Sequence, residues 1–201
     1  MFRLIESIRI ENRIPHLMSY HNRRFNNACK ILYNLDKTFD LNDYIFLPAN
    51  LSKERHKFRI LFDGHAFETR CQKYHQRKIE SVNIVTFDKI AYPFKTTERY
   101  MLEKAYNQRN KCDDVLIVKN GLITDGFVSN ILLYDGGKWV TPANPLLKGV
   151  QREYLIDSQS VIEKDVSIDD IYGYTYIKLI NAMVPFERAE VIDIRKGVFG
   201  I

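Results

Sequence analysis

The chain has 201 residues, of which 45% are hydrophobic and 27% charged, so it is long enough for one large domain or two small ones. Its 9 Gly and 6 Pro exclude collagen-like and linker-rich architectures. No apolar run reaches the roughly 18 residues that a membrane span needs. The charged N-terminus is also unlike a signal peptide. We therefore expect a cytoplasmic protein.

The net charge of +5 is unevenly distributed. Residues 1–80 carry 15 Lys and Arg against 9 Asp and Glu, whereas residues 81–201 carry 15 against 16. A basic half can attract nucleic acid, a membrane surface or a small anion. No zinc-finger spacing, RNP-like aromatic pattern or basic heptad accompanies the charge, so we expect no nucleic-acid or membrane partner. A non-catalytic anion or nucleic-acid binder remains the alternative class, and the three scattered cysteines predict no metal site.

Hydrophobic periodicity in the first half predicts a mixture of strands and one long helix. In chain order we expect a strand over 2–10, a turn at 11–13, a return strand over 14–17, a helix over about 18–33 ended by Asn34, and strands over 57–63 and 82–87. The polar stretch 65–80 favours no element.

The second half begins where Pro93 interrupts regular structure. Thr96 or Thr97 can cap a helix that runs to about Gln108. Beyond it we expect strands over 115–118, 122–125 and 131–134, a turn at 135–138 into a strand over 139–141, a helix from Gly149 or Val150, and strands over 174–180 and 191–194. The fold class is therefore α+β, with a small N-terminal α/β domain (1–90), a larger strand-rich domain (95–201) and a junction at 91–94.

An ordered series of short segments runs through both halves. It comprises residues 20–24, 94–99, 122–126, 129–131, 141–142 and 149–152. In order and approximate spacing, this series resembles the class IV aminotransferase family, the pyridoxal-phosphate enzymes of fold type IV. The likeness spans most of the chain and implies that fold, an enzymatic function and pyridoxal 5'-phosphate as cofactor. Residues 181–185 further resemble the lyase branch of the family.

The resemblance implies a role for several single residues. Lys95 would bind the cofactor aldehyde covalently, and Asp125, where most relatives have Glu, would face the pyridine nitrogen directly or through a water. Arg24, three residues after His21, would bind the phosphate, although Arg23 could exchange roles with it. Further cofactor-binding candidates are Ser129, Asn130, Leu147, Gly149, Val150, Gln151 and Asn181, and the candidates for substrate binding are Arg59 and Arg99.

The segment around Gly149 has a physical rationale for binding phosphate. A glycine lets the backbone approach a ligand closely, and the N–H groups of Val150 and Gln151 would open a helix toward the anion. Relatives often have Thr where Gln151 stands, so an amide would replace a hydroxyl there. Leu146 or Leu147 could pack on the face of the cofactor ring.

Three features favour one reaction within the family, that of 4-amino-4-deoxychorismate lyase, which releases pyruvate and 4-aminobenzoate in folate synthesis. They are the short chain, the basic first half, which suits a dianionic substrate, and the segment 181–185. A branched-chain or D-amino-acid aminotransferase is the alternative, and a member that binds cofactor without turnover also stays open. The resemblance further implies a homodimer that acts on a small amino substrate.

Overall fold

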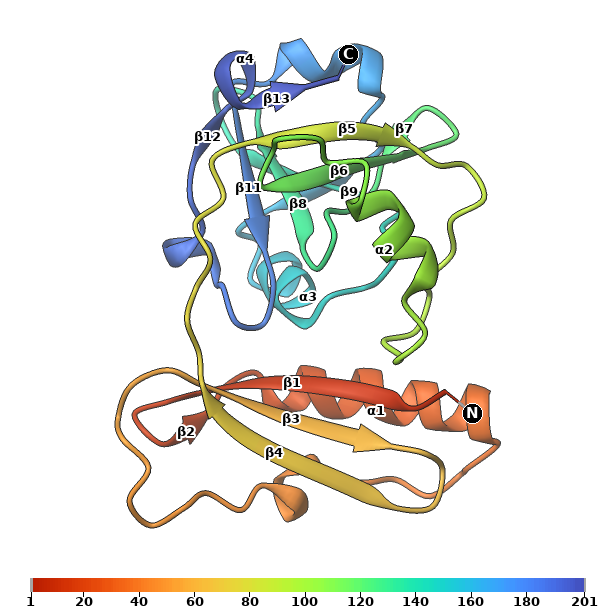
Figure 1. Ribbon diagram of the computed structural model, residues 1–201, viewed down its shortest axis with the longest axis vertical. Helices are drawn as coiled ribbons and strands as arrows, with labels where there is room; N and C mark the ends of the chain where they lie inside the picture. The colour runs from red at the N-terminus through yellow and green to blue at the C-terminus, as the bar shows by residue number, and fades with distance from the viewer. Residues whose placement is uncertain (1, 201) are drawn as a thin grey trace. The chain divides into compact units, whose positions relative to one another are not determined.

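Two units, each with its own hydrophobic core, make up the computed structural model, which describes residues 2–200 (Figure 1). The first unit holds residues 2–76 together with Phe94–Glu98. The second holds Arg77–Pro93 and residues 99–200. No helix in the described part of the chain is long and apolar enough to cross a bilayer.

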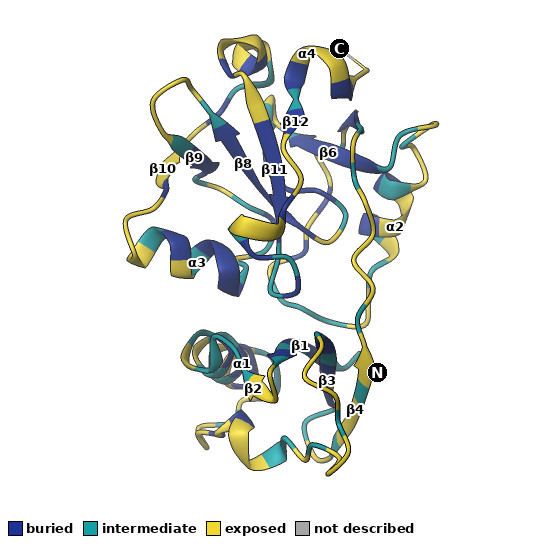
Figure 2. Cartoon of the chain, turned by 90° about the vertical axis from the view of Figure 1, so that its left-hand side faces the viewer, coloured by how far each residue is buried: buried dark blue, intermediate teal, exposed yellow. Residues whose placement is uncertain are grey.

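The first unit is a four-stranded antiparallel sheet with one long helix on its face. Its elements are β1 (Leu4–Glu11), β2 (Ile14–Pro15), α1 (Met18–Tyr33), a 3-10 turn (Leu41–Tyr44), β3 (His56–Phe62) and β4 (Phe67–Lys73). The strand order is β2-β1-β3-β4, and α1 lies along β1 in both ribbon views (Figures 1 and 2). The helix predicted over 18–33 is confirmed, and Asn34 ends it with a left-handed φ of 54°.

Alternation along the strands sends one set of side chains toward α1. Leu4, Ile8 and Ile10 of β1 pack with Phe58 and the other core residues of β3 and α1. These side chains are almost fully buried, and at roughly 1.5–3 kcal/mol for each fully buried large apolar side chain they dominate the stability of this unit. Strand β4 lies in the polar stretch that favoured no element, because it is an edge strand whose side chains are mostly exposed.

Residues 94–98 join the first unit by pairing with the edge of β1 that β3 leaves open. Ile5 donates its N–H to the carbonyl of Lys95 (2.8 Å), and Thr97 donates to the carbonyl of Arg3 (2.9 Å). The hydroxyl of Thr97 accepts from the N–H of Arg3 (3.0 Å), so it is not a helix cap. Helix α2 (Tyr100–Tyr106) follows Arg99 without a side-chain cap. The predicted cap at Thr96 or Thr97 is therefore wrong, and the helix is shorter than predicted.

The second unit contains two sheets. One has the order β10-β9-β8-β11-β12 and the other β13-β5-β6-β7. Figure 2 shows β8 and β11 almost wholly buried, which makes them central to the core. The strands are β5 (Val82–Thr86), β6 (Asp114–Lys119), β7 (Leu122–Ile123), β8 (Asn130–Tyr134), β9 (Trp139–Pro142), β10 (Ile162–Lys164), β11 (Tyr176–Ile180), β12 (Ile192–Asp193) and β13 (Val198–Phe199), with helices α3 (Val150–Asp157) and α4 (Ile194–Gly197) and 3-10 turns at Ile168–Gly173 and Phe186–Arg188.

The division between the units differs from the expected one at residues 91–94. Strand β5 pairs in parallel with β6, with Asn83 opposite Val115, and β13 pairs with its other edge. These hydrogen bonds place residues 77–93 in the second unit, while the pairing of Lys95 and Thr97 with β1 places residues 94–98 in the first.

Helix α3 is fixed at its start by one buried arginine. The side chain of Arg152 is 1% exposed and forms ion pairs with Glu153 (2.7 Å) and Glu163 (2.5 Å). Its guanidinium also donates to the carbonyl of Pro142 (2.9 Å) at the end of β9. A buried cation needs such partners to offset its desolvation. Arg152 thereby ties the beginning of α3 to β9 and β10.

Candidate functional site

In the second unit the buried carboxylate of Asp125 lies in a shell of neutral donors, unlike the buried Asp114, which pairs with Arg77 (2.7 Å). Asp125 follows Thr124 directly after β7 and is 4% exposed. Its Oδ1 accepts from the side-chain amide of Asn130 (2.6 Å), and its Oδ2 accepts from the backbone N–H groups of Leu146 and of Leu147 (3.2 Å). A carboxylate has about four acceptor positions, so Asp125 can still take one further donor.

Burial raises the pKa of Asp125 from 3.8 to about 7. The backbone N–H groups and the Asn130 amide pull the pKa down again, but they carry no formal charge, and Arg152 contributes least. Desolvation disfavours the ionised carboxylate unless a cation stands beside it. The arrangement is therefore suited to a ligand that brings a positively charged N–H group.

Asn130 connects Asp125 to the segment before α3. Besides Asp125, its amide nitrogen donates to the carbonyl of Leu147 (2.8 Å). A Cβ at position 149 would lie 1.9 Å from its Oδ1, a distance that real Cβ atoms do not tolerate. Glycine is therefore needed at 149 to make room for Asn130, which is a different reason from the phosphate approach that we expected from the sequence.

Ser129 and Asn181 are linked on the neighbouring strand ends. Asn181 donates through its amide nitrogen to the Ser129 hydroxyl (3.3 Å) and to the carbonyl of Val128 (3.3 Å). Its Oδ1 accepts from the N–H groups of Met183 (2.9 Å) and Val184 (3.0 Å). Asn181 thus closes the turn after β11 and holds the segment that carries Ser129.

The start of α3 provides the remaining candidates of this unit. Val150 and Gln151 are 2% and 3% exposed and occupy the first turn of the helix, after Gly149 as N-cap. First-turn N–H groups have no acceptor within their own helix. Eight predicted cofactor residues therefore belong to one unit, namely Asp125, Ser129, Asn130, Leu147, Gly149, Val150, Gln151 and Asn181.

The first unit also contains a buried carboxylate, that of Glu6, and it pairs with a charged partner. Glu6 accepts from Arg24 at both oxygens, from Nε (2.9 Å) and Nη2 (2.5 Å). The Nδ1 of His21 lies 2.6 Å from Oε2 of the same carboxylate. Glu6 and His21 are 2% and 0% exposed, and the side chain of Arg24 is 16% exposed. Arg24 is therefore part of a buried ion pair that the sequence did not reveal.

Burial alone would raise the pKa of Glu6, but the charges of Arg24 and His21 and their hydrogen bonds bring it down to about 2. Burial lowers the pKa of His21, Glu6 opposes this, and Arg24 and Lys95 lower the pKa further. Because an ionised carboxylate only accepts hydrogen bonds, Nδ1 of His21 is the donor to Glu6. The interaction with His21 places Lys95 in the electrostatic field of this cluster.

The two adjacent arginines of α1 are not equivalent. Arg23 is exposed, and its guanidinium lies 4.9 Å from the centre of the Tyr20 ring. Arg24 faces the core side of the helix and meets Glu6. Of the two, Arg24 has the fixed orientation that recognition of a ligand requires.

The two predicted substrate arginines lie in different units. Arg59 is exposed on β3, directly opposite Arg70 of β4. Arg99 precedes α2, and its guanidinium lies 4.7 Å from the centre of the Phe127 ring. One nitrogen of Arg99, Nη2, is buried without a hydrogen-bond partner. An unpaired buried donor is costly, so Arg99 is the better prepared of the two to bind a carboxylate.

The sequence reasoning missed Glu6, His21 and the backbone donors of residues 146–147. A signal for Glu6 was available, because Leu4, Ile8 and Ile10 define the core side of β1 and Glu6 has the same parity. An acid at a core position needs a partner. The backbone donors to Asp125 had no signal in the sequence.

Comparison with known proteins gives three findings. The family described as "Amino-transferase class IV" matches residues 68–190. An uncharacterized protein of Haemophilus influenzae is 31% identical over 185 residues, which are 91% of this chain and 98% of that protein. A Schizosaccharomyces pombe protein assigned as an aminodeoxychorismate lyase is 32% identical over 98 residues, 44% of this chain and 42% of the yeast protein.

Among solved structures, one from Haemophilus somnus, described as a 4-amino-4-deoxychorismate lyase, superposes with a TM-score of 0.85 at 29% identity. The likeness covers 92% of this chain and 98% of that one. The fold is therefore that of the fold type IV pyridoxal-phosphate enzymes, as the sequence led us to expect. The chain belongs to the class IV aminotransferase family and is a pyridoxal-phosphate-dependent enzyme.

The residues present fit the cofactor of this family. The buried carboxylate of Asp125 lacks a cation and has room for one further donor, which a protonated pyridine nitrogen would supply. Arg24 binds Glu6 through only two of its three guanidinium nitrogens, so donors remain for a phosphate oxygen. The first-turn N–H groups of Val150 and Gln151 are also suited to an anion.

Proposed function

We propose that this protein is a 4-amino-4-deoxychorismate lyase, which converts its substrate to 4-aminobenzoate and pyruvate in folate synthesis. One observation carries the proposal. The likeness to the Haemophilus somnus structure extends over nearly the full length of both chains, at 29% identity and a TM-score of 0.85. The match to the yeast protein points in the same direction.

In this proposal Lys95 binds the cofactor covalently and moves the proton. Bound pyridoxal phosphate supplies an electron sink for negative charge at the substrate carbon. The Nζ of Lys95 would take a proton from the substrate and return it, acting first as base and then as acid. The field of the Glu6–His21–Arg24 cluster acts on this lysine, and the backbone bond from Ile5 fixes its main chain (2.8 Å).

We further propose that Asp125 keeps the pyridine nitrogen protonated, with Asn130 and the backbone of Leu147 orienting the carboxylate. Gly149 would permit that arrangement, and Ser129 and Asn181 would hold the neighbouring segment. Arg24 and the N–H groups of Val150 and Gln151 would bind the phosphate. The support is the neutral shell of Asp125 and the first-turn position of residues 150–151.

For the substrate we propose Arg99 as the carboxylate-binding residue, because its buried Nη2 lacks a partner and its guanidinium is held against Phe127. Phe127 comes two residues after Asp125. Arg59 is the second candidate, with an exposed side chain on β3.

The decisive experiment supplies aminodeoxychorismate as the only substrate. The lyase should release pyruvate over many turnovers without any keto acid. An aminotransferase would need a keto acid as second substrate. Turnover of D-alanine or a branched-chain amino acid with 2-oxoglutarate, together with no pyruvate from aminodeoxychorismate, would replace the lyase by an aminotransferase.

The proposal includes a cytoplasmic homodimer as the working form. This part rests on the family resemblance alone. Light scattering at micromolar concentration should report twice the chain mass of 23.7 kDa. A species of 23.7 kDa under these conditions would refute the dimer.

A further inference from the structure

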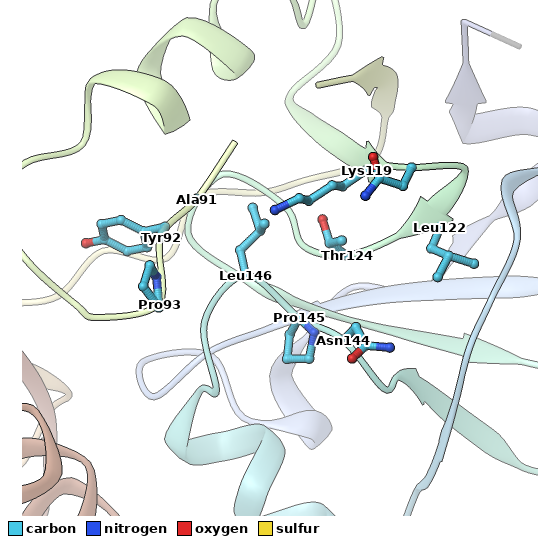
Figure 3. Close-up of a pocket in the computed structure, with 10 residues that line it drawn as sticks. Ala91, Tyr92, Pro93, Lys119, Leu122, Thr124, Asn144, Pro145 and Leu146 are labelled. Carbon is cyan, nitrogen blue, oxygen red and sulfur yellow. The ribbon is translucent and has the colours of Figure 1, made fainter. Parts of the chain in front are cut away.

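A cavity lies in the second unit beside the segments that hold Asp125. Its volume is about 430 Å³, and it is lined by residues of three segments, namely 91–93, 119, 120, 122 and 124, and 144–146 (Figure 3). Of the residues predicted to bind cofactor or substrate, only Leu146, one of two candidates for the ring face, lines it. The size is that of a typical small-molecule pocket.

The walls of the cavity are largely apolar, and one cation projects into it. Tyr92, Pro93, Leu122 and Leu146 supply hydrocarbon surface, and Figure 3 shows the side chain of Lys119 reaching toward Leu146. The ammonium of Lys119 donates to the carbonyl of Ile90 (2.8 Å), which uses one of its three protons. Within residues 2–200 Lys119 forms no ion pair with a carboxylate.

A half-buried ammonium without a counter-ion, at the edge of an apolar cavity, matches a ligand with one negative charge and an apolar body. We propose that this cavity binds a small monocarboxylate with an aromatic or branched hydrocarbon body. The carboxylate would meet Lys119, and the apolar body would lie against Tyr92 and Leu146. Asn144, whose amide nitrogen is taken by Asp165 (2.8 Å), can offer only its second proton.

The cavity is connected to Asp125 through the backbone. The N–H of Leu146, a lining residue, donates to the carboxylate of Asp125. Thr124, another lining residue, precedes Asp125 and is held by its hydroxyl to the carbonyl of Ile117 (3.0 Å). Pro93 comes two residues before Lys95 in the chain. The cavity thus borders the backbone segment that donates to Asp125.

The test uses benzoate as the probe and the full chain with pyridoxal phosphate present. Titration followed by amide NMR should shift the signals of Tyr92, Lys119 and Leu146 first. The neutral analogue benzamide should bind at least about tenfold more weakly, because it lacks the charge-assisted contact. Lys119→Met should weaken benzoate binding by about the same factor, whereas Lys138→Met, at an exposed lysine of the same unit, should not.

Three results would overturn the proposal. They are no benzoate binding at millimolar concentration, equal affinity for benzoate and benzamide, and shifts confined to Asn130 and Gly149. Should Lys119→Met fail to fold, the shift map and the benzamide comparison on the unmodified protein still decide. Each readout is a binding signal, so its result is independent of whether the enzyme is a lyase.

Discussion

Two of the buried carboxylates of this protein, Glu6 in the first unit and Asp125 in the second, have opposite electrostatic surroundings. Glu6 meets an arginine and a histidine, and its pKa falls to about 2. Asp125 meets an amide and two backbone N–H groups, and its pKa rises to about 7. Burial is almost the same for both, at 2% and 4% exposed. Glu6 thus has its cationic partner within the fold, whereas Asp125 has only neutral donors and is suited to a cationic ligand.

The largest expected effect concerns the lysine in the field of the Glu6 cluster. Lys95→Ala should lower pyruvate release at least about a thousandfold, because the residue both binds the cofactor and moves the proton. Borohydride reduction of the unmodified enzyme should leave the pyridoxyl group on the peptide that contains Lys95. Lys104→Ala, within helix α2, is the control and should keep its pyruvate-releasing activity. A label on Lys89 or Lys104 would contradict the assignment.

The next effect is a dependence of stability on pH that originates in Asp125. Its folded-state pKa is about 7 and its ordinary value 3.8. Between these values the folded protein without cofactor holds more protons than the unfolded chain, so the free energy of unfolding falls as pH rises. The shift of about three units corresponds to roughly 4 kcal/mol.

Urea titrations of the cofactor-free protein between pH 5 and 7.5 measure this effect. Asp125→Asn should lack the decline, and added pyridoxal phosphate should reduce it in the unmodified protein. A decline of the same size in Asp125→Asn would show that another group titrates, and the contrast between the two carboxylates would be lost.

Glu6 should show the reverse dependence on pH. Its folded-state pKa of about 2 lies below the ordinary 4.5, so its stabilisation is present above pH 4.5 and is lost as pH falls toward 2. Glu6→Gln should lower the free energy of unfolding by about 3 kcal/mol near neutral pH, because Arg24 loses its buried counter-ion. The gap between variant and unmodified protein should narrow in acid. A gap that is constant from pH 3 to pH 7 would rule out the ion pair as its cause.

The smallest effect is on cofactor affinity. Arg24→Ala should weaken pyridoxal-phosphate binding by roughly ten- to a hundredfold, since a charge-assisted contact contributes about 1.5–3 kcal/mol. Arg23→Ala is the matched control on the adjacent, exposed position and should leave the affinity unchanged. The opposite result would assign the phosphate to Arg23. Fluorescence titration of the cofactor-free protein measures both.

Several elements could be predicted because their pattern is local. Helix α1 follows from its apolar spacing and from Asn34, and the start of α3 from Gly149. Strand β4 could not be predicted, because most of its side chains are polar and exposed and only Phe67 and Cys71 pack against the core. The helix cap at Thr97 failed for a related reason, since its hydroxyl accepts from Arg3, 94 residues away in the chain.

The residues of the site were easier to name than their contacts. The ordered series of short segments predicts Lys95, Asp125 and Asn130 from the sequence alone. Asn130 excludes every side chain at position 149, because a Cβ there would lie 1.9 Å from its Oδ1. The spacing of residues in the sequence does not predict this contact. Glu6 was within reach of the sequence, through its parity on β1, and was overlooked.

The pairing of residues 94–98 with β1 limits where the chain can be cut to give fragments that fold. A fragment that ends at residue 76 contains every helix and strand of the first unit, yet it lacks the acceptor for the N–H of Ile5 and the donor for the carbonyl of Arg3. The chain crosses from one unit to the other three times, after residues 76, 93 and 98. No single cut yields both units intact. During synthesis, the first unit cannot complete its pairing along β1 until the chain has been made up to residue 98.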